Sequence, residues 1–221
     1  MNVGVVCEGL NDFLALREIV SVFATRAGKT LNRFDPIQPK VDATSRQVNG
    51  GGWRRVQAWL KENSGESVKD ILAPRLFSAS PNYDILIIHL DGDVYYLDDK
   101  ISAADRARCF GRPKEISKLI EHRIHMILDP PDDLDDQILY AVPVMHMESW
   151  LLAAVVRGPL RRNIENIRLK HKALRYLAYR FPNDDRFGSL TAARELGRKL
   201  NILRAQFESL DHFAAKLEKI I

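Results

Sequence analysis

Residues 83–93 read YDILIIHLDGD, and this stretch decides the fold that the sequence predicts. Nearly every position from Tyr83 to Leu90 is apolar, which is typical of a strand buried on both faces of a parallel sheet. The strand ends in two acidic residues, Asp91 and Asp93, separated by Gly92. The glycine lets both carboxylates turn to one side once the strand has ended. The sequence therefore predicts an acidic site at one end of a buried strand.

Strands and helices alternate along the chain on both sides of this stretch. The predicted elements are a strand over residues 3–6, a helix over 13–23, an edge strand leading to 41, a helix over 53–60, the strand over 83–90, a helix over 114–128, a strand over 138–144 and a helix from 146 onward. Asn11 or Asp12 is expected to cap the first helix. The alternation predicts an α/β fold, with a Rossmann-like, mainly parallel sheet that carries helices on both faces. Residues 1–155 are expected to form this domain, and 156–221 a basic helical extension packed on it.

Composition excludes several classes of protein. The chain has 221 residues, of which 46% are hydrophobic and 28% charged, as in ordinary globular domains. No apolar run approaches the roughly 18–20 residues that span a bilayer, and the N-terminus lacks a signal-peptide pattern, so no membrane association is expected. Only two cysteines are present, which excludes a disulfide scaffold and a zinc ribbon. We expect a cytoplasmic protein.

The net charge of +4 is unevenly distributed along the chain. Residues 157–221 contain 15 Lys and Arg against 7 Asp and Glu, a net +8, which leaves −4 for residues 1–156. A basic C-terminal region on an acidic body suggests a polyanionic partner, although basic residues on solvated helix faces are also common.

Acidic residues follow three of the predicted strands. Glu8 follows the first strand, Asp91 and Asp93 follow the central one, and Glu148 follows the last. Because ligands of open α/β sheets bind outside the carboxyl ends of the strands, these four side chains are expected to converge. Ionised carboxylates held together need a cation, and oxygen ligands favour Mg²⁺, Mn²⁺ or Ca²⁺ over zinc. We therefore predict a site for one or two ions suited to phosphoryl transfer.

Other residues are candidates for supporting roles. His146 is a candidate general base, with a structural histidine as the alternative. Asp12 could join the metal ligands, and His89 is expected to be a core residue bonded to backbone. The candidates for binding phosphate or nucleic acid are Gly51, Gly52 and Arg54, before and in the second helix, and Arg161, Arg162, Lys170 and Lys172 in the basic region. A flexible loop and a solvated helix face remain the alternatives for these two groups.

Two segments resemble the toprim domain of topoisomerases, primases and overcoming-lysogenisation-defect nucleases. They are VVCEG at residues 5–9 and LIIHLDGD at residues 86–93. Toprim domains carry a Glu after the first strand and an Asp-x-Asp after a later strand, which correspond to Glu8, Asp91 and Asp93. The segment HMESWLLA at 146–153 is similar to one in small stand-alone prokaryotic toprim-like proteins, and it corresponds to Glu148. The resemblance covers roughly residues 1–155 and implies a toprim fold and Mg²⁺-dependent cleavage or joining of nucleic-acid strands.

The chain also departs from the larger members of that family. It is too short to include a second domain with a nucleophilic tyrosine, and it lacks the G-x-x-x-x-G-K-[ST] motif of an ATPase. We therefore expect a Mg²⁺- or Mn²⁺-dependent nuclease acting on DNA or RNA, in phage defence or DNA processing. The alternative is a non-enzymatic effector or binding subunit of an ATPase-containing defence complex with a relict metal site. A homodimer is a further option. A nucleotide-binding enzyme is disfavoured because the first turn lacks G-x-G-x-x-G.

Overall fold

The computed structural model describes residues 1–41, 48–49, 52–72, 82–98, 100–109, 112–156, 170–181, 183 and 189–221. The strands are β1 (Asn2–Val6), β2 (Arg33–Gln38), β3 (Lys40–Val41), β4 (Val48–Asn49), β5 (Ile85–His89) and β6 (Ile138–Ala141). The α-helices are α1 (Leu10–Arg26), α2 (Trp53–Glu62), α3 (Lys69–Leu72), α4 (Val94–Leu97), α5 (Ala103–Cys109), α6 (Pro113–Leu128), α7 (Met147–Val155), α8 (Lys170–Arg180), α9 (Ser189–Arg204) and α10 (Glu208–Ile220). Two short 3₁₀ segments are η1 (Gly65–Val68) and η2 (Asp132–Gln137).

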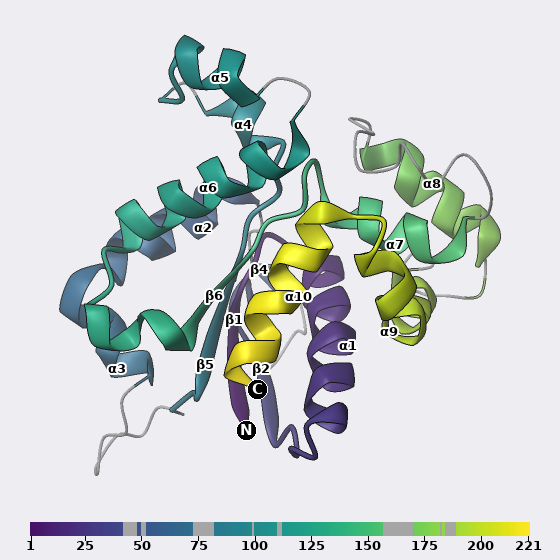
Figure 1. Ribbon diagram of the computed structural model, residues 1–221, viewed down its shortest axis with the longest axis horizontal. Helices are drawn as coiled ribbons and strands as arrows, with labels where there is room; N and C mark the ends of the chain where they lie inside the picture. Colours follow the sequence, from purple (N-terminus) through teal and green to yellow (C-terminus); the bar gives the residue numbers. More distant parts are fainter. Residues whose placement is uncertain are drawn as a thin grey trace.

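Four parallel strands form the central sheet in the order β2-β1-β5-β6. Helices cover both faces, as Figure 1 shows. On one face, Val3, Val5 and Ile87 pack with α1, α7, α8, α9 and α10. On the other, Val6 and Ile88 pack with α2, α3, α5 and α6. The prediction of an α/β fold with a parallel sheet and helices on both faces is confirmed. Helices are needed on both faces because successive strand residues bury their side chains on opposite faces of the sheet.

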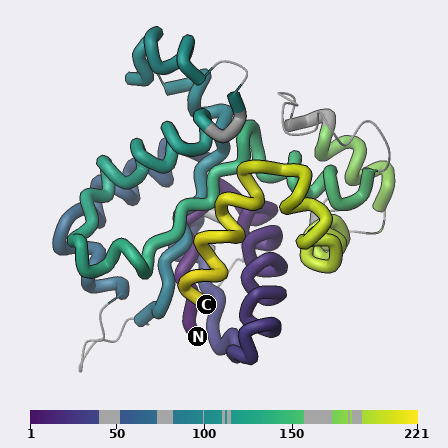
Figure 2. Tube along the Cα trace, viewed as in Figure 1, coloured from purple at the N-terminus to yellow at the C-terminus, as the bar shows by residue number. Residues whose placement is uncertain are grey.

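The helices near the C-terminus belong to one of these two layers. Figure 2 follows the chain from β1 to α10, which runs beside α1. Buried residues of α9 and α10, such as Leu196, Leu200 and Phe213, lie in the same hydrophobic cluster as Val5 of the sheet. Trp150 of α7 donates a hydrogen bond from its indole nitrogen to Ser209 Oγ of α10 (3.0 Å). Part of the basic C-terminal region therefore completes the core of the α/β layer.

Several predicted boundaries differ from those observed. Helix α1 begins at Leu10 with Gly9 at the N-cap, so the prediction that Asn11 or Asp12 caps it is wrong. The expected edge strand is β2, which contains Pro36 and ends before Val41, while Val41 pairs with Val48 in a separate two-stranded sheet. Helices α4 and α5 were not predicted, because elements of four and seven residues are too short for a periodic pattern. Within the described residues, no helix combines the length and apolar character needed to cross a membrane.

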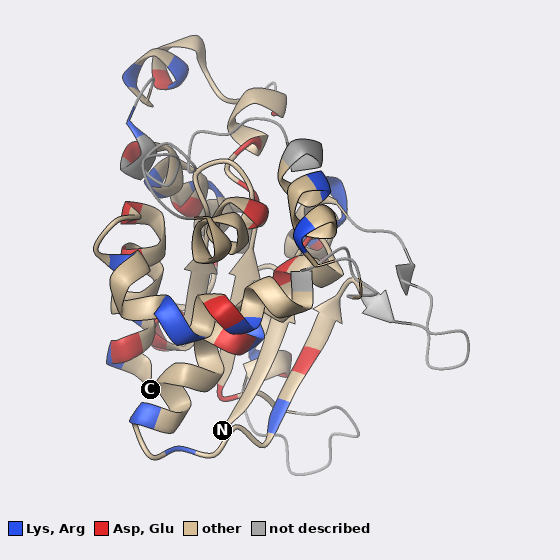
Figure 3. Cartoon of the chain, turned by 90° about the vertical axis from the view of Figure 1, so that its right-hand side faces the viewer, with Lys and Arg blue, Asp and Glu red and all other residues tan. Residues whose placement is uncertain are grey.

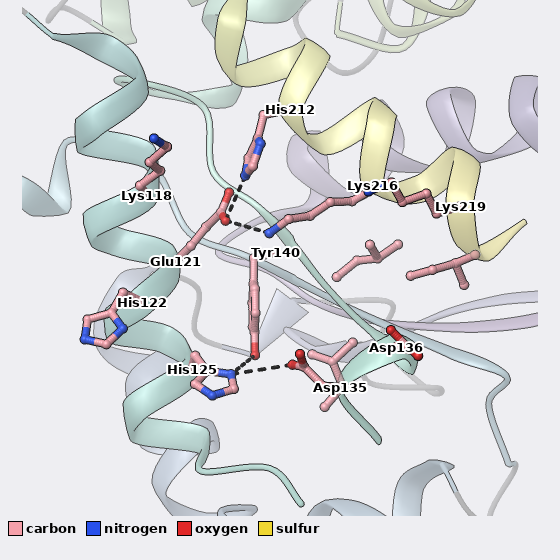
Figure 4. A pocket seen from close by; sticks show the side chains of 13 residues that line it. Lys118, Glu121, His122, His125, Asp135, Asp136, Tyr140, His212, Lys216 and Lys219 are labelled. Atoms are coloured by element: carbon pink, nitrogen blue, oxygen red, sulfur yellow. Dashed lines mark hydrogen bonds and ion pairs between the residues drawn. The ribbon is translucent and has the colours of Figure 1, made fainter. Parts of the chain in front are cut away.

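The two edges of the sheet are protected in different ways. Figure 3 shows that the strands are nearly free of charge except β2, where Arg33 and Asp35 form an ion pair of 3.1 Å. Charged side chains on an edge strand oppose pairing with other chains. At the other edge, α6 and α10 meet beside β6 (Figure 4). The Glu121 carboxylate of α6 accepts hydrogen bonds from His212 Nε2 (3.1 Å) and Lys216 Nζ (2.8 Å) of α10.

This contact between α6 and α10 can be tested by mutation. Glu121 is only 8% exposed, and its removal leaves His212 and Lys216 of α10 without their hydrogen-bond acceptor. We expect Glu121→Ala to lower the free energy of unfolding by about 1–2 kcal/mol, measured by urea denaturation. The matched control is Glu115→Ala on the same helix, since Glu115 forms only an exposed pair with Lys118 at 3.4 Å. Equal effects of the two substitutions would contradict a specific role for Glu121.

Candidate functional site

The order of the strands creates a switch point between β1 and β5. From β1 the chain passes through α1 to β2 on one side, whereas β5 lies on the other side of β1. Ligands of open α/β sheets bind at such a point, outside the carboxyl ends of the two strands. Glu8 lies just beyond β1 and Asp91 just beyond β5. The backbone N–H of Asp91 donates a hydrogen bond to Glu8 Oε1 (2.7 Å), which joins the two strand ends directly.

Asp12, His89 and Asp91 converge at this point. One potential ligand atom from each lies within 4.8 Å of those from the other two. His89 is the last residue of β5, and its Nδ1 lies 3.7 Å from Asp12 Oδ2 and its Nε2 3.4 Å from Asp91 Oδ1. The prediction that His89 bonds to backbone is therefore wrong, because its two ring nitrogens face the carboxylates. Asp12 lies in the first turn of α1, where the helix dipole also favours negative charge.

Buried charges determine the protonation of this group. Burial raises the pKa of the Glu8 carboxyl to about 8, and the nearby Asp91 carboxylate adds to the increase. Burial by itself lowers the pKa of His89, but Asp12 and Asp91 outweigh this effect, and its pKa rises to about 9. These shifts favour the protonated forms of Glu8 and His89 at neutral pH, so His89 must release a proton before one of its ring nitrogens can bind a metal ion. Protons carried by the protein offset most of the negative charge at this site.

The loop after β6 lies against the turn after β5. The backbone N–H groups of Gly92 and Asp93 donate to the carbonyls of Pro143 (3.0 Å) and Met145 (2.9 Å). In return, the N–H of Met147 donates to Asp91 Oδ1 (2.9 Å). These bonds bring the N-terminus of α7, and with it Glu148, next to the switch point. Gly92 is required because of this close packing, rather than to let the carboxylates turn.

His146 and Glu148 form a second buried pair beside the first group. His146 Nδ1 lies 3.5 Å from Glu148 Oε2, and both side chains are 1% exposed. Neither ring nitrogen of His146 makes a hydrogen bond within the described part of the chain. A buried imidazole of this kind is available for proton transfer or ligation. His146 and Glu148 lie at the start of α7, where Met147 bonds to Asp91.

The predicted residues are thus only partly brought together. Glu8, Asp91, His146 and Glu148 lie around the carboxyl ends of β1, β5 and β6. Asp93 occupies the N-cap position of the short helix α4, without a side-chain capping hydrogen bond, and is outside the converging group of Asp12, His89 and Asp91. Cys7 is buried beside Glu8, and its thiol donates to the Gly9 carbonyl (3.2 Å). Burial raises the pKa of this thiol, as expected for a packed and unreactive cysteine.

Only some of the predicted phosphate-binding residues belong to the described part of the chain. The N–H of Gly52 donates to the Glu8 carbonyl (2.8 Å), so the start of α2 lies at the site but this amide is already bonded. Arg54 is exposed, with its guanidinium 5.5 Å from the centre of the Trp53 ring. Gly51, Arg161 and Arg162 lie outside the described residues, and Lys170 and Lys172 begin α8.

A cavity of about 510 Å³ lies elsewhere, along the free edge of β6. Figure 4 shows its lining between α6 and α10, where Glu121 bonds to His212 and Lys216, and His125 to Tyr140. None of the predicted site residues lines it. The cavity therefore belongs to the α6–α10 contact and not to the group at the strand ends.

Which metal these residues could hold can be judged from their donor atoms. Two ligands of a small divalent ion are at most about 4.2 Å apart, because each lies about 2.1 Å from the ion. The ligand atoms of Asp12, His89 and Asp91 lie within 4.8 Å of one another and would therefore need to move closer together to share one such ion. This donor set of two carboxylates and one imidazole fits a divalent metal ion.

Comparison of the chain with protein-family models, curated proteins and solved structures finds no match.

Proposed function

We propose that the chain is a metal-dependent nuclease of toprim type, in which Asp12, His89 and Asp91 hold a divalent cation. The observation that carries the proposal is their convergence with Glu8 at the switch point between β1 and β5. The ion would supply Lewis-acid stabilisation of a phosphodiester and a lowered pKa for the attacking water. His146, buried beside Glu148, is the candidate to accept or return a proton. The resemblance of residues 5–9 and 86–93 to toprim domains supports the same reaction class.

The imidazole of His89 favours Mn²⁺ over Mg²⁺. Magnesium prefers oxygen ligands and keeps several waters, whereas imidazole is a better ligand for later first-row ions. The group of Asp12, His89 and Asp91 offers one imidazole and two carboxylates. Mn²⁺ tolerates both donor types and supports phosphoryl-transfer chemistry. The cofactor proposed is therefore Mn²⁺, with Mg²⁺ as a weaker activator.

Cleavage assays test the proposal directly. Plasmid DNA and labelled single- and double-stranded DNA and RNA are incubated with the purified chain and Mn²⁺, Mg²⁺ or EDTA. We expect cleavage with Mn²⁺, slower cleavage with Mg²⁺ and none with EDTA, because the buried carboxylates alone cannot stabilise an anionic transition state. Cleavage that persists in EDTA contradicts the proposal. No cleavage of any substrate with either ion also counts against a nuclease acting alone.

One observation favours the alternative of a non-enzymatic subunit. Asp12, His89, Asp91 and Glu148 are each at most 2% exposed, and His89 itself offsets carboxylate charge. A relict metal site would have the same features, because its acidic residues would remain buried with their charge offset by a neighbouring histidine. Such a site would fit an effector of an ATPase-containing defence complex. Co-purification with an ATPase, together with neither metal binding nor cleavage by the isolated chain, would favour this second function.

A further inference from the structure

Helix α8 carries an exposed patch of two tyrosines and two arginines. Tyr179 is 85% exposed and Tyr176 42%, and Arg175 and Arg180 are also exposed. On a helix, Arg175 neighbours Tyr179 and Tyr176 neighbours Arg180, four residues apart, so the four side chains form one continuous patch. The opposite face, with Ala173 and Leu177, is buried against the core. Packing therefore does not explain the tyrosines.

The sequence on either side of this patch is rich in basic residues. The sequence has no Asp or Glu between Glu165 and Asp184. Within the described part of the chain, no hydrogen bond or ion pair occupies the four side chains of the patch. Two unpaired guanidinium groups with two exposed aromatic rings match the chemistry of single-stranded nucleic acid, in which phosphates alternate with exposed base faces. A duplex would offer its phosphates but not its base faces.

The position of α8 relates the patch to the candidate metal site. Helix α8 packs against α7, whose first turn carries Glu148. In Figure 1, α8 lies at the end of the molecule that the carboxyl ends of the strands face. A nucleic-acid strand bound to α8 would therefore lie at the same end of the molecule as the candidate metal site.

We propose that Arg175, Tyr176, Tyr179 and Arg180 form a platform that binds single-stranded DNA or RNA by stacking and phosphate contacts. The inference rests on the proposed function, since it names the substrate class of the same site. Stacking on tyrosine is indifferent to base identity, so binding is expected to be independent of sequence and to weaken with salt.

Fluorescence anisotropy with labelled oligonucleotides in EDTA tests this platform without interference from cleavage. We expect single strands to bind more tightly than duplexes, and Tyr179→Ala to weaken binding about tenfold, within the range for one stacked base. Tyr179→Phe keeps the ring and should bind within about twofold of wild type. Ile202→Ala on α9, where Ile202 is 58% exposed, is the control for loss of an exposed apolar side chain. Since alanine favours helix, circular dichroism should show all variants folded.

The outcomes separate this inference from the proposed function. Equal binding by Tyr179→Ala and wild type, equal losses in the Ala and Phe variants, or no binding of single strands overturns the platform. A Tyr179-dependent association between protein chains without nucleic-acid binding overturns it too. Binding that depends on Tyr179 without cleavage in Mn²⁺ supports the platform and counts against the nuclease. Metal-dependent cleavage that is unchanged in Tyr179→Ala supports the nuclease and counts against the platform.

Discussion

Asp91→Asn is expected to abolish divalent metal binding and to reduce cleavage at least about a hundredfold, since the metal contributes several kcal/mol to transition-state stabilisation. Asp91 is central to the site, because its side chain faces His89 and its backbone N–H bonds to Glu8. Asparagine keeps the size of the side chain and an oxygen to accept the N–H of Met147, now bonded to Asp91 Oδ1 at 2.9 Å. The fold should therefore survive while the anionic ligand is lost. Isothermal titration with Mn²⁺ and the cleavage assay measure the two effects.

The matched control lies at the other end of the same strand. Asp84 precedes β5 and accepts a hydrogen bond from the N–H of Asn2 (2.6 Å). Asp84→Asn makes the same chemical change far from the switch point, and it should leave metal binding and cleavage unchanged. If Asp91→Asn binds Mn²⁺ like wild type, the proposed site is wrong. If metal binding is lost but cleavage is kept, the ion is not part of the chemistry.

The approximate position of the candidate site could be predicted from the sequence, because it follows from parallel topology. Once residues 85–89 form a buried parallel strand, Asp91 must lie beyond its carboxyl end. The same reasoning places Glu8 and Glu148 at that end. The pattern of apolar residues therefore locates the rim of the sheet, although it does not locate any individual side chain on it.

Asp91 and Asp12 were both candidate metal ligands from the sequence, whereas the role of His89 could not be predicted in this way. His89 occupies a strand position that alternation treats as core, and only the structure shows its ring between Asp12 and Asp91. The position of the Asp12 side chain depends on α1 beginning at Leu10, and helix boundaries are poorly defined by sequence. One signal was present in the sequence. A histidine directly before an acidic turn could have been treated as a candidate ligand in its own right.

The structure shows that the basic residues of 157–221 do not all serve the same purpose. The net charge of residues 157–221 suggested a surface for polyanions, but α9 and α10 use much of their surface to build the core. Arg204 of α9, for example, is paired with Asp211 and Glu218 of α10 at 3.0 and 2.6 Å. Such paired arginines cannot account for nucleic-acid binding. The proposed platform is therefore placed on α8, where the arginines and tyrosines are exposed and form no such pair within the described residues.

Gly92→Ala is expected to destabilise the protein by about 3 kcal/mol or more and to inactivate the site. A Cβ atom at Gly92 would overlap the carbonyl oxygens of Pro143 and Val144 and lie 2.5 Å from the Val144 carbonyl carbon. These are backbone atoms, which cannot move aside as a flexible side chain can, so overpacking here should reach or exceed its usual cost. In the Gly92→Ala variant, the turn after β5 and the loop before α7 would have to move apart to relieve this overlap. The hydrogen bond from Met147 to Asp91 would then be lost, and the metal ligands displaced.

Thermal unfolding and Mn²⁺ titration measure this prediction, with Gly9→Ala as the control. For a chain of this size, about 3 kcal/mol corresponds to a fall of roughly 6–12 °C in Tm. Gly9 also follows a strand at the rim, but a Cβ there meets only Asp12 Oδ2, at an ordinary 3.5 Å, and its backbone is extended with φ −156°. Gly9→Ala should therefore change Tm by no more than a few degrees. If Gly92→Ala is as stable as Gly9→Ala, the close packing between the two loops is wrong, and Glu148 has no fixed place beside Asp91.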